Sequence, residues 1–394
     1  MKVKSFLFGA FDDAKTKPPV RTGPGTMRSC WKVILWSLKA AFEGRWPDRD
    51  FNDDPWPIGS FEASKAGTLL AGGFFMVLWS LKGDLDYLAK GLHLRHYSRN
   101  EFCIFCPANS VLGDFGMNWN NFRGDSTWKT CPFTVDQWRA AHEDLHWMFT
   151  ELPYVTHHNV DPDELHLLHL GTTPRLLGSI FYILCYMCMP GTPQQNLDQL
   201  WNRICIFYKR HGTETQFSNI SLGSFCNTKS PGAHYPEFKG RGAEMKDLIR
   251  PTLDCWTFFA PTYEFDTIRR VLLAQIDMQG ILSDHADEVF LPEGAAIDLM
   301  GATDRFLGEY SKLVNKADSD GQLLWNLTPK YHWLWHWSRR SMFLNPRRAN
   351  CMLDEDFVGH MKTIVASCVS GTALEEVPTK LMEKVQWVQH FTTL

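Results

Sequence analysis

A long apolar run that ends just before an acidic residue is the feature that most constrains how this chain can fold. The run extends from Leu69 to Leu81, and Asp84 follows it. It is shorter than the ~20 apolar residues that a membrane-spanning helix needs. We therefore expect a buried element, a strand over residues 74–81, which leads into a short helix over residues 85–92.

The acids after this run have two readings. An acid at the carboxyl end of a buried strand lies on the rim of an α/β site, where it can bind a metal. Alternatively, Asp84 caps the helix that follows, and Asp86 lies in the first turn, where the helix dipole favours anions. Taken alone, the residues favour the cap.

A Cys-x-x-Cys pair follows at Cys103 and Cys106. Two thiolates at this spacing can hold one edge of a tetrahedral zinc site, which needs two further ligands. The alternative is a turn with two unliganded thiols. The side chains considered as further ligands are His93, His96, Cys131, His157 and His158.

Composition limits the classes of protein that remain. The formal net charge of -4 gives no global basic signature, so DNA binding would have to rest on a local basic patch. The 11 cysteines, an odd number scattered through apolar runs, indicate reduced thiols in an intracellular protein. The N-terminal apolar run is too short for a signal peptide and ends at Asp12 and Asp13, so we expect a strand there.

A helix rich in histidine is expected from residue 161 onward. Asp161 suits an N-cap, and Glu164 completes a capping-box-like pattern. Capping does not explain Asp163, His166 and His169, which repeat on one side of the helix. They could bind a metal or orient an active-site group, and the sequence leaves structural and functional readings open.

A segment rich in aromatic and basic residues follows much later. Arginines hold phosphates in a bidentate way, and aromatic rings stack on bases, so the segment is a candidate DNA-binding surface. The alternative is a buried aromatic helix followed by a solvated basic loop. His332 and His336 are spaced i, i+4 and could also ligate a metal. The candidate DNA-binding residues are Lys330, Arg339, Arg340, Arg347 and Arg348.

Three acids, Asp354, Glu355 and Asp356, begin a further predicted helix. Acids in a first helical turn are favoured by the helix dipole, which explains them without any chemistry.

The order of these motifs resembles that of eukaryotic cut-and-paste DNA transposases of the Plavaka, CACTA and Kyakuja-Dileera-Zisupton types, or of an uncharacterised family derived from such elements. The resemblance spans roughly residues 70–370. It is carried by the residues around Asp84, Cys103-x-x-Cys106, Asp163-Glu164-Leu165-His166, Pro329-Lys330-Tyr331-His332 and Asp354-Glu355-Asp356-Phe357.

The resemblance implies an α/β fold, with an RNase H-like mixed sheet flanked by helices and interrupted by a large, mainly helical insertion. The expected segments are an N-terminal part of the core (1–130), the insertion (131–310) and closing C-terminal helices (311–394).

The resemblance also implies a catalytic site. Acids from separate elements would bind Mg²⁺ or Mn²⁺, which prefer oxygen ligands. Asp84 would be the second acid, and Glu355 the last, with Asp354 and Asp356 as rivals. Asp12 and Asp13 are the candidates for the first. Cys103 and Cys106 would hold zinc, and Asp163 and His166 are further candidate metal ligands.

Three functions follow as hypotheses. The first is a transposase-derived, metal-dependent DNA nuclease and strand transferase. The second is an inactive, zinc-stabilised nucleic-acid-binding or interaction protein of the same descent. The third is an unrelated metal hydrolase that uses the helices around His166 and His332. The expected partners are DNA and a second copy of the chain, with no membrane, and the expected location is intracellular, in the nucleus.

Overall fold

The chain forms two compact units, each assembled from discontinuous segments. The computed structural model describes residues 26–111, 116–142, 144–260, 266–373 and 376–392. Unit 1 comprises Met1–Leu81, Asp144–Asn159 and Met352–Leu394, and unit 2 comprises Lys82–Glu143 and Val160–Cys351. The sequence had suggested three consecutive segments (1–130, 131–310 and 311–394) instead.

The expected RNase H-like mixed sheet is wrong. The described residues are mainly helical, and their sheet has two short strands, β1 (Leu81–Gly83) and β2 (Val160–Pro162). Strands of three residues cannot form the core of a mixed sheet. Residues 74–80, expected as a buried strand, form neither helix nor strand, and Phe74 is 81% exposed. The fold class had come from the order of short motifs, which does not fix strand pairing.

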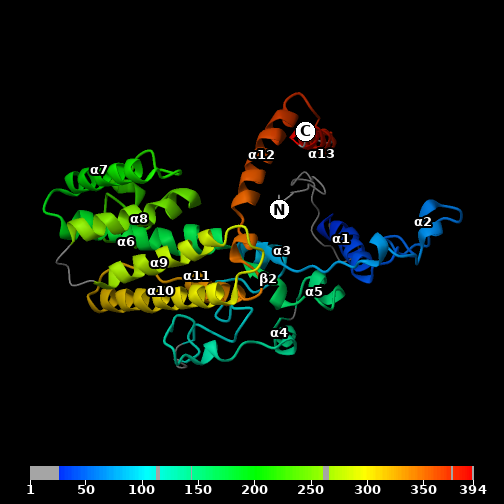
Figure 1. Ribbon diagram of the computed structural model, residues 1–394, viewed down its shortest axis with the longest axis horizontal. Coiled ribbons are helices and arrows are strands. Elements are labelled where there is room, and N and C mark those ends of the chain that lie inside the picture. The colour runs from blue at the N-terminus through cyan, green and yellow to red at the C-terminus, as the bar shows by residue number, and fades with distance from the viewer. Residues whose placement is uncertain (1–25, 112–115, 143, 261–265, 374–375, 393–394) are drawn as a thin grey trace. The chain divides into compact units, whose positions relative to one another are not determined.

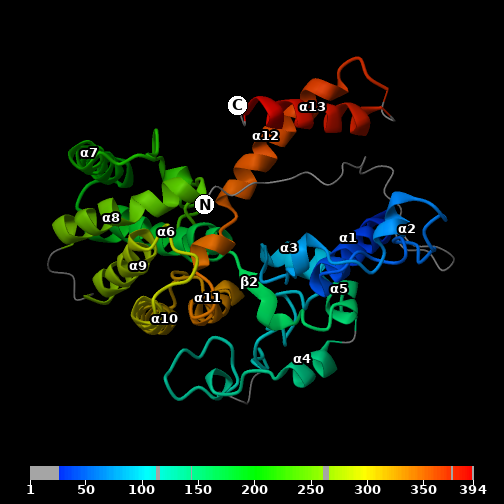
Figure 2. The same ribbon diagram turned by 45° about the vertical axis from the view of Figure 1, so that its right-hand side comes forward.

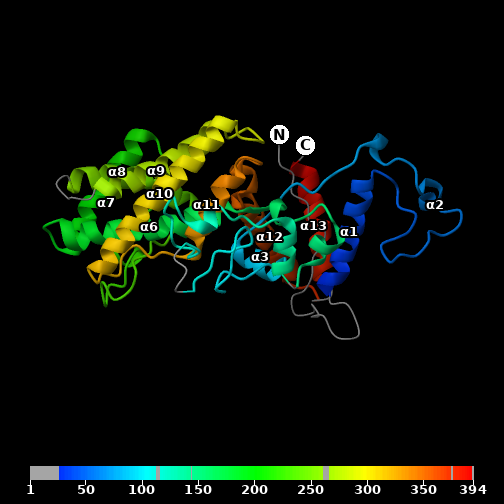
Figure 3. The same cartoon turned by 90° about the horizontal axis from the view of Figure 1, so that it is seen from below.

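Unit 2 is built around a bundle of helices that lie side by side (Figures 1 and 3). Its buried core includes the aromatic residues Phe306, Tyr310 and Tyr331, whose rings lie 4.5–6.3 Å apart. We call α6, α8, α9, α10 and α11 the helical bundle. The helices of unit 2 from α6 onward are α6 (Thr173–Ile183), α7 (Pro193–His211), α8 (Gly242–Phe259), α9 (Asp266–Asp284), α10 (Glu293–Ser319) and α11 (Pro329–Arg340).

Local sequence signals explain where such helices begin and end, and α7 has most of them. The Thr192 side chain accepts a hydrogen bond from the backbone of Gln195, whose side chain bonds back to Thr192. Pro193 occupies the first turn, and Gly212 ends the helix in a left-handed conformation at φ 58°. The predicted helices over 195–211, 241–260 and 330–343 are thus confirmed, with shifts of a few residues at their ends.

The histidine-rich helix is confirmed, but its start differs from the prediction. A continuous helical run contains a π-helical stretch η5 (Leu165–Thr172), then α6, then a second π-helical stretch η6 (Leu184–Cys188). Asp161 lies in β2 and does not cap the run. Asp163 takes that role, since its carboxylate accepts hydrogen bonds from the backbone N–H groups of Leu165 and His166.

The part of unit 2 before this run has little regular structure. We call residues 92–111 and 116–134 the Cys segment. It connects α3 (Leu85–Gly91) to α4 (Val135–Ala141) and includes one 3-10 turn, η3 (Thr127–Lys129). Its side chains are nevertheless deeply buried, with Phe102 and Trp128 at 1% and 0% exposure. Side-chain packing therefore orders this segment in place of regular secondary structure.

Unit 1 consists of three long helices, α1, α12 and α13, and two short ones, α2 and α5, with irregular segments between some of them (Figure 2). The ring of Phe42 on α1 stacks on Tyr154 at 4.2 Å. The hairpin of α12 and α13 packs around Cys368, Leu381 and Val385. The predicted helix over 136–150 is divided between α4 and α5. The helices of unit 1 are α1 (Thr26–Glu43), α2 (Phe61–Lys65), α5 (Trp147–Glu151), α12 (Met352–Val369) and α13 (Val377–Thr392).

The remaining short elements are single turns: η2 (Ala71–Gly73), η4 (His157–Asn159), η7 (Leu222–Ser224) and η8 (Pro346–Ala349). Across all described residues, no helix combines the length and the apolar character needed to cross a membrane.

Candidate metal centre

Four buried side chains from two distant parts of unit 2 form one cluster of metal-binding atoms. Cys103 and Cys106 come from the Cys segment, and His332 and His336 come from α11. Their ligand atoms all lie within 4.8 Å of one another. It is the one group of three or more His, Cys, Asp or Glu ligands close enough to share an ion among the residues that the structure describes.

The spacing within this cluster fits a tetrahedral ion. The two sulfur atoms lie 3.7 Å apart, Cys106 Sγ lies 3.4 Å from His332 Nε2, and the two Nε2 atoms lie 3.2 Å apart. A tetrahedral zinc ion with Zn–S of about 2.3 Å and Zn–N of about 2.0–2.1 Å holds its ligand atoms about 3.3–3.8 Å apart. These three distances match that spacing, and the remaining pairs lie within 4.8 Å, so the cluster could bind one metal ion of this type.

Local structure on both sides holds the ligands in place. Pro329 in the first turn of α11 and the i, i+4 spacing put His332 and His336 on one face of that helix. The backbone N–H of Phe105 donates to Cys103 Sγ at 3.3 Å, and that of Ala108 bonds to the Cys106 thiol. Such N–H donors stabilise thiolates, so the turn is shaped for negatively charged sulfur.

A second layer of contacts orients one imidazole. His332 Nδ1 lies 3.2 Å from the carbonyl oxygen of Trp119, which can only accept. Nδ1 must therefore carry the proton, which leaves the lone pair of Nε2 directed at the cluster. The ring centroids of Trp128 and Phe102 lie 4.3 and 5.4 Å from that of His332, so the surroundings are dry and aromatic.

The electrostatics of the cluster favour a cation. Burial opposes ionisation of Cys103, but the hydrogen bond from Cys106 and the nearby imidazoles outweigh it and lower the pKa of the Cys103 thiol well below its usual value. Burial, and then the Cys103 thiolate, raise the pKa of Cys106 well above its usual value. Burial also lowers the pKa of His336, so its imidazole stays neutral and able to ligate. A divalent cation at the cluster would compete with protons for both thiols.

Asp163 and His166, which the sequence offered as further metal ligands, lie outside this cluster and pair with each other. Asp163 is fully buried and lies 2.5 Å from His166 Nδ1. It also accepts a hydrogen bond from the backbone N–H of Cys351. Burial alone would raise the pKa of Asp163, but the bonds from His166 and Cys351 lower it. The carboxylate ties β2 and η5 to the end of unit 2.

The predicted catalytic acids do not gather in one unit. Asp84 belongs to unit 2 and caps α3, with its Oδ1 accepting a hydrogen bond from the backbone N–H of Tyr87 at 2.6 Å. Asp354, Glu355 and Asp356 begin α12 in unit 1. Asp12 and Asp13 lie outside the described residues. No carboxylate cluster suited to Mg²⁺ occurs in the described part of the chain.

The predicted DNA-binding cations have partners inside unit 2. Arg339 bonds Asp304 at 2.6 Å and lies over the Trp335 ring, and Arg340 bonds Asp161 at 2.8 Å. Arg348 donates to the carbonyl groups of Glu288 and Asp287. These pairings hold the end of α11 and η8 in place.

The other two predicted cations also make contacts within unit 2, Lys330 through its side chain and Arg347 through its backbone. Lys330 Nζ donates to the carbonyl of Leu170 at 3.4 Å, and burial lowers the pKa of Lys330. The backbone N–H of Arg347 donates to the side chain of Asn345.

Sequence reasoning identified each half of the metal cluster but did not join them. The Cys pair was expected to find its partners among nearby residues, and the His pair was considered separately. The available signal was that two incomplete sites, each with two ligands, complete one tetrahedral set. Comparison with family models, with curated proteins and with solved structures found no match to this chain.

Proposed function

We propose that the chain binds one zinc ion through Cys103, Cys106, His332 and His336, and that this ion has a structural role. The observation that carries the proposal is the convergence of four buried ligand atoms at tetrahedral spacing. Two thiolates with two imidazoles suit Zn²⁺, whereas Mg²⁺ requires oxygen ligands that this cluster lacks.

A structural role is favoured over a catalytic one by the number of ligands. Catalytic zinc sites use three protein ligands and keep the fourth position for water or substrate. Here four side chains fill the tetrahedron, and the most exposed of them, His336, is 7% exposed. The ion would instead join the Cys segment to α11, since Cys106 and His332 are 226 residues apart in the chain.

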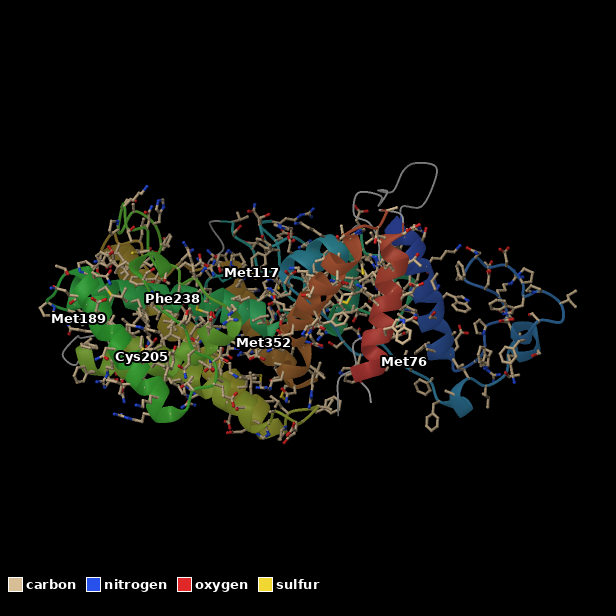
Figure 4. The ribbon with its side chains drawn as sticks, turned by 90° about the horizontal axis from the view of Figure 1, so that it is seen from above. Met76, Met117, Met189, Cys205, Phe238 and Met352 are labelled. Atoms are coloured by element: carbon tan, nitrogen blue, oxygen red, sulfur yellow. The ribbon has the colours of Figure 1, made fainter. Side chains whose placement is uncertain are left out.

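Metal analysis of the reduced protein tests this proposal. We expect about one zinc per chain, and tetrahedral cobalt spectra with thiolate charge-transfer bands after substitution with Co²⁺. Cys106→Ser and His332→Ala should each abolish stoichiometric zinc. Cys205→Ser removes an exposed thiol on α7 (Figure 4) and should leave the metal content unchanged. Zinc retained at full stoichiometry in the Cys106→Ser, His332→Ala double variant would overturn the assignment.

The transposase-derived function remains a prediction, together with its DNA partner, its homo-oligomer and its nuclear location. Of its two forms, the inactive zinc-stabilised one agrees better with the arrangement described above. Mg²⁺-dependent nicking of DNA that disappears in Asp84→Asn would support the active form. An absence of nicking, with zinc content intact, would favour the inactive one.

A further inference from the structure

The most exposed apolar stretch among the described residues lies in unit 1, far in sequence from the metal ligands. We call residues 70–81 the apolar segment, of which Figure 4 labels Met76. It has no charged side chain. Five of its side chains are substantially exposed: Phe74 (81%), Phe75 (68%), Met76 (54%), Val77 (41%) and Trp79 (52%).

The backbone of this segment is held in place despite its exposure. The N–H of Met76 donates to the carbonyl of Ala41 at 2.8 Å. The Asn159 side chain donates to the carbonyl groups of Leu78 and Trp79 at 2.9 and 3.3 Å. A β-carbon at Gly44 would come within 3.2 Å of the Phe74 carbonyl oxygen, so the end of α1 lies directly against the segment. The segment is therefore anchored inside unit 1 and presented in a fixed form.

The exposed area is larger than a monomer ordinarily leaves uncovered. Large side chains each present about 150–250 Å², so five that are about half exposed leave roughly 500 Å² of apolar surface. Contiguous apolar patches above a few hundred Å² mark interaction sites. Two copies of this surface would bury at most about 1,000 Å² in total, which is the lower limit for a specific interface.

We propose that this surface pairs with its own equivalent in a second copy of the chain, to form a symmetric dimer. An uncharged apolar segment is complementary to itself, because two copies that pack about a twofold axis bring no like charges together. With Val77 at the axis, the side chain of Phe75 of each copy lies opposite that of Trp79 of the other. Such aromatic pairs stabilise an interface beyond their buried area. This surface is independent of the zinc site.

Sedimentation analysis of the full chain over a range of concentrations tests the dimer. We expect a reversible monomer–dimer equilibrium, and Val77→Asp should raise the dimer dissociation constant by about 100-fold or more, because it brings two carboxylates together at the axis. Ile297→Asp, at a side chain that is 52% exposed on α10, is the matched control and should leave the dimer intact. Val77→Cys should form an intermolecular disulfide on oxidation, whereas Ile297→Cys should not.

Four outcomes would overturn the proposal. A chain that stays monomeric at every concentration, with slow amide exchange over residues 74–80, would show that its own residues cover the segment. Dimerisation that appears only after removal of residues 1–25 would assign the surface to that N-terminal segment. Assemblies that grow without limit would indicate an open edge and not a closed pair. A dimer unaffected by Val77→Asp would place the interface elsewhere.

Discussion

The Cys segment and the helical bundle belong to the same compact unit, but different interactions order them. In the bundle each helix satisfies its own backbone, and apolar faces such as those around Phe306 and Tyr310 join the helices. In the Cys segment the backbone hydrogen bonds are confined to turns and isolated pairs, such as that of Asn109 with Met117. Side chains also bond to carbonyl groups, as Trp128 Nε1 and Ser126 Oγ do with Asn121.

This difference explains why the metal cluster lies where it does. An irregular segment loses much conformational entropy on ordering and gains little regular hydrogen bonding in return. A metal cross-link to α11 would compensate, because it would fix the segment to a helix that is already stable. The aromatic packing of Trp128 against His332 serves the same purpose. Five predictions test this comparison, first within the two regions and then at the elements beside them.

Removal of the metal should have the largest effect and should confine it to one region. Binding of a structural zinc contributes many kcal/mol in small zinc domains. We expect a zinc chelator, under reducing conditions, to raise amide exchange in peptides from residues 102–134 by about 100-fold or more, while α9 and α10 stay protected. Measurement by hydrogen exchange and mass spectrometry decides the matter. An equal loss of protection in α9 and α10 would mean that the two regions are not separable.

Truncation of one large buried ring should destabilise the whole unit when the ring lies in the helical bundle, and only the local structure when it lies in the Cys segment. Trp128→Ala and Phe306→Ala each remove a fully buried aromatic side chain, at a cost of about 3–5 kcal/mol. We expect Phe306→Ala to lower the denaturation midpoint of the whole unit in urea. Trp128→Ala should mainly raise exchange in the Cys segment. Ile297→Ala, at an exposed position on α10, should change neither measurement, and a global effect of Trp128→Ala would contradict local ordering.

Asp163→Asn tests the junction between the start of η5 and Cys351, which a buried carboxylate holds together. The Cys segment differs, because its contact with α11 is made by candidate metal ligands. The variant should cost about 3 kcal/mol at pH 7, because a buried carboxylate that accepts several hydrogen bonds becomes an amide. The lowered pKa of Asp163 fixes the pH dependence. Its carboxylate stabilises the fold fully above the unfolded pKa of about 3.9, and this contribution is lost as the pH falls through the lower folded value.

Urea unfolding of the wild type and of Asp163→Asn between pH 7 and pH 3 measures this effect. The difference in unfolding free energy should be constant down to about pH 5 and should begin to narrow below about pH 4, as the pH falls from the unfolded pKa toward the lower folded one. A difference that persisted unchanged at pH 3 would show that the charge of Asp163 is not what stabilises the junction.

A change at a helix cap should be smaller and should touch only the helical region. Thr192→Ala removes the hydroxyl group that caps α7 and should cost about 1 kcal/mol, whereas Thr192→Ser should restore most of the stability. Chemical denaturation of the three proteins provides the comparison. Equal stability of the alanine and serine variants would remove the cap as the explanation.

The smallest effect is expected at Asp84, where structure and predicted chemistry disagree. Asn caps a helix about as well as Asp, so Asp84→Asn should change the free energy of unfolding by only a few tenths of a kcal/mol, and Asp84→Ala by about 1 kcal/mol. Thermal unfolding tests this ordering. A clear stabilisation by Asp84→Asn would indicate that the carboxylate is strained in the fold, as acids held for chemistry are.

The helices could be read from the sequence because their signals are local. Capping residues such as Thr192, first-turn prolines such as Pro193 and Pro329, and apolar spacing each act over a few residues. The prediction that Asp84 caps a helix also rested on local signals, and the structure confirms it, since Asp84 caps α3. The Cys-x-x-Cys spacing likewise indicated one edge of a possible tetrahedral zinc site, with two unliganded thiols in a turn as the alternative.

Tertiary structure decided which segments meet. No local pattern relates Cys106 to His332 across 226 residues, because their proximity depends on how α11 packs against the Cys segment. In the same way, apolar residues 74–80 could suggest a strand, but a strand exists only when another backbone pairs with it. The sequence therefore determined the helices and two half-sites. Packing in three dimensions determined that the half-sites form one cluster, and that the described residues build no mixed sheet.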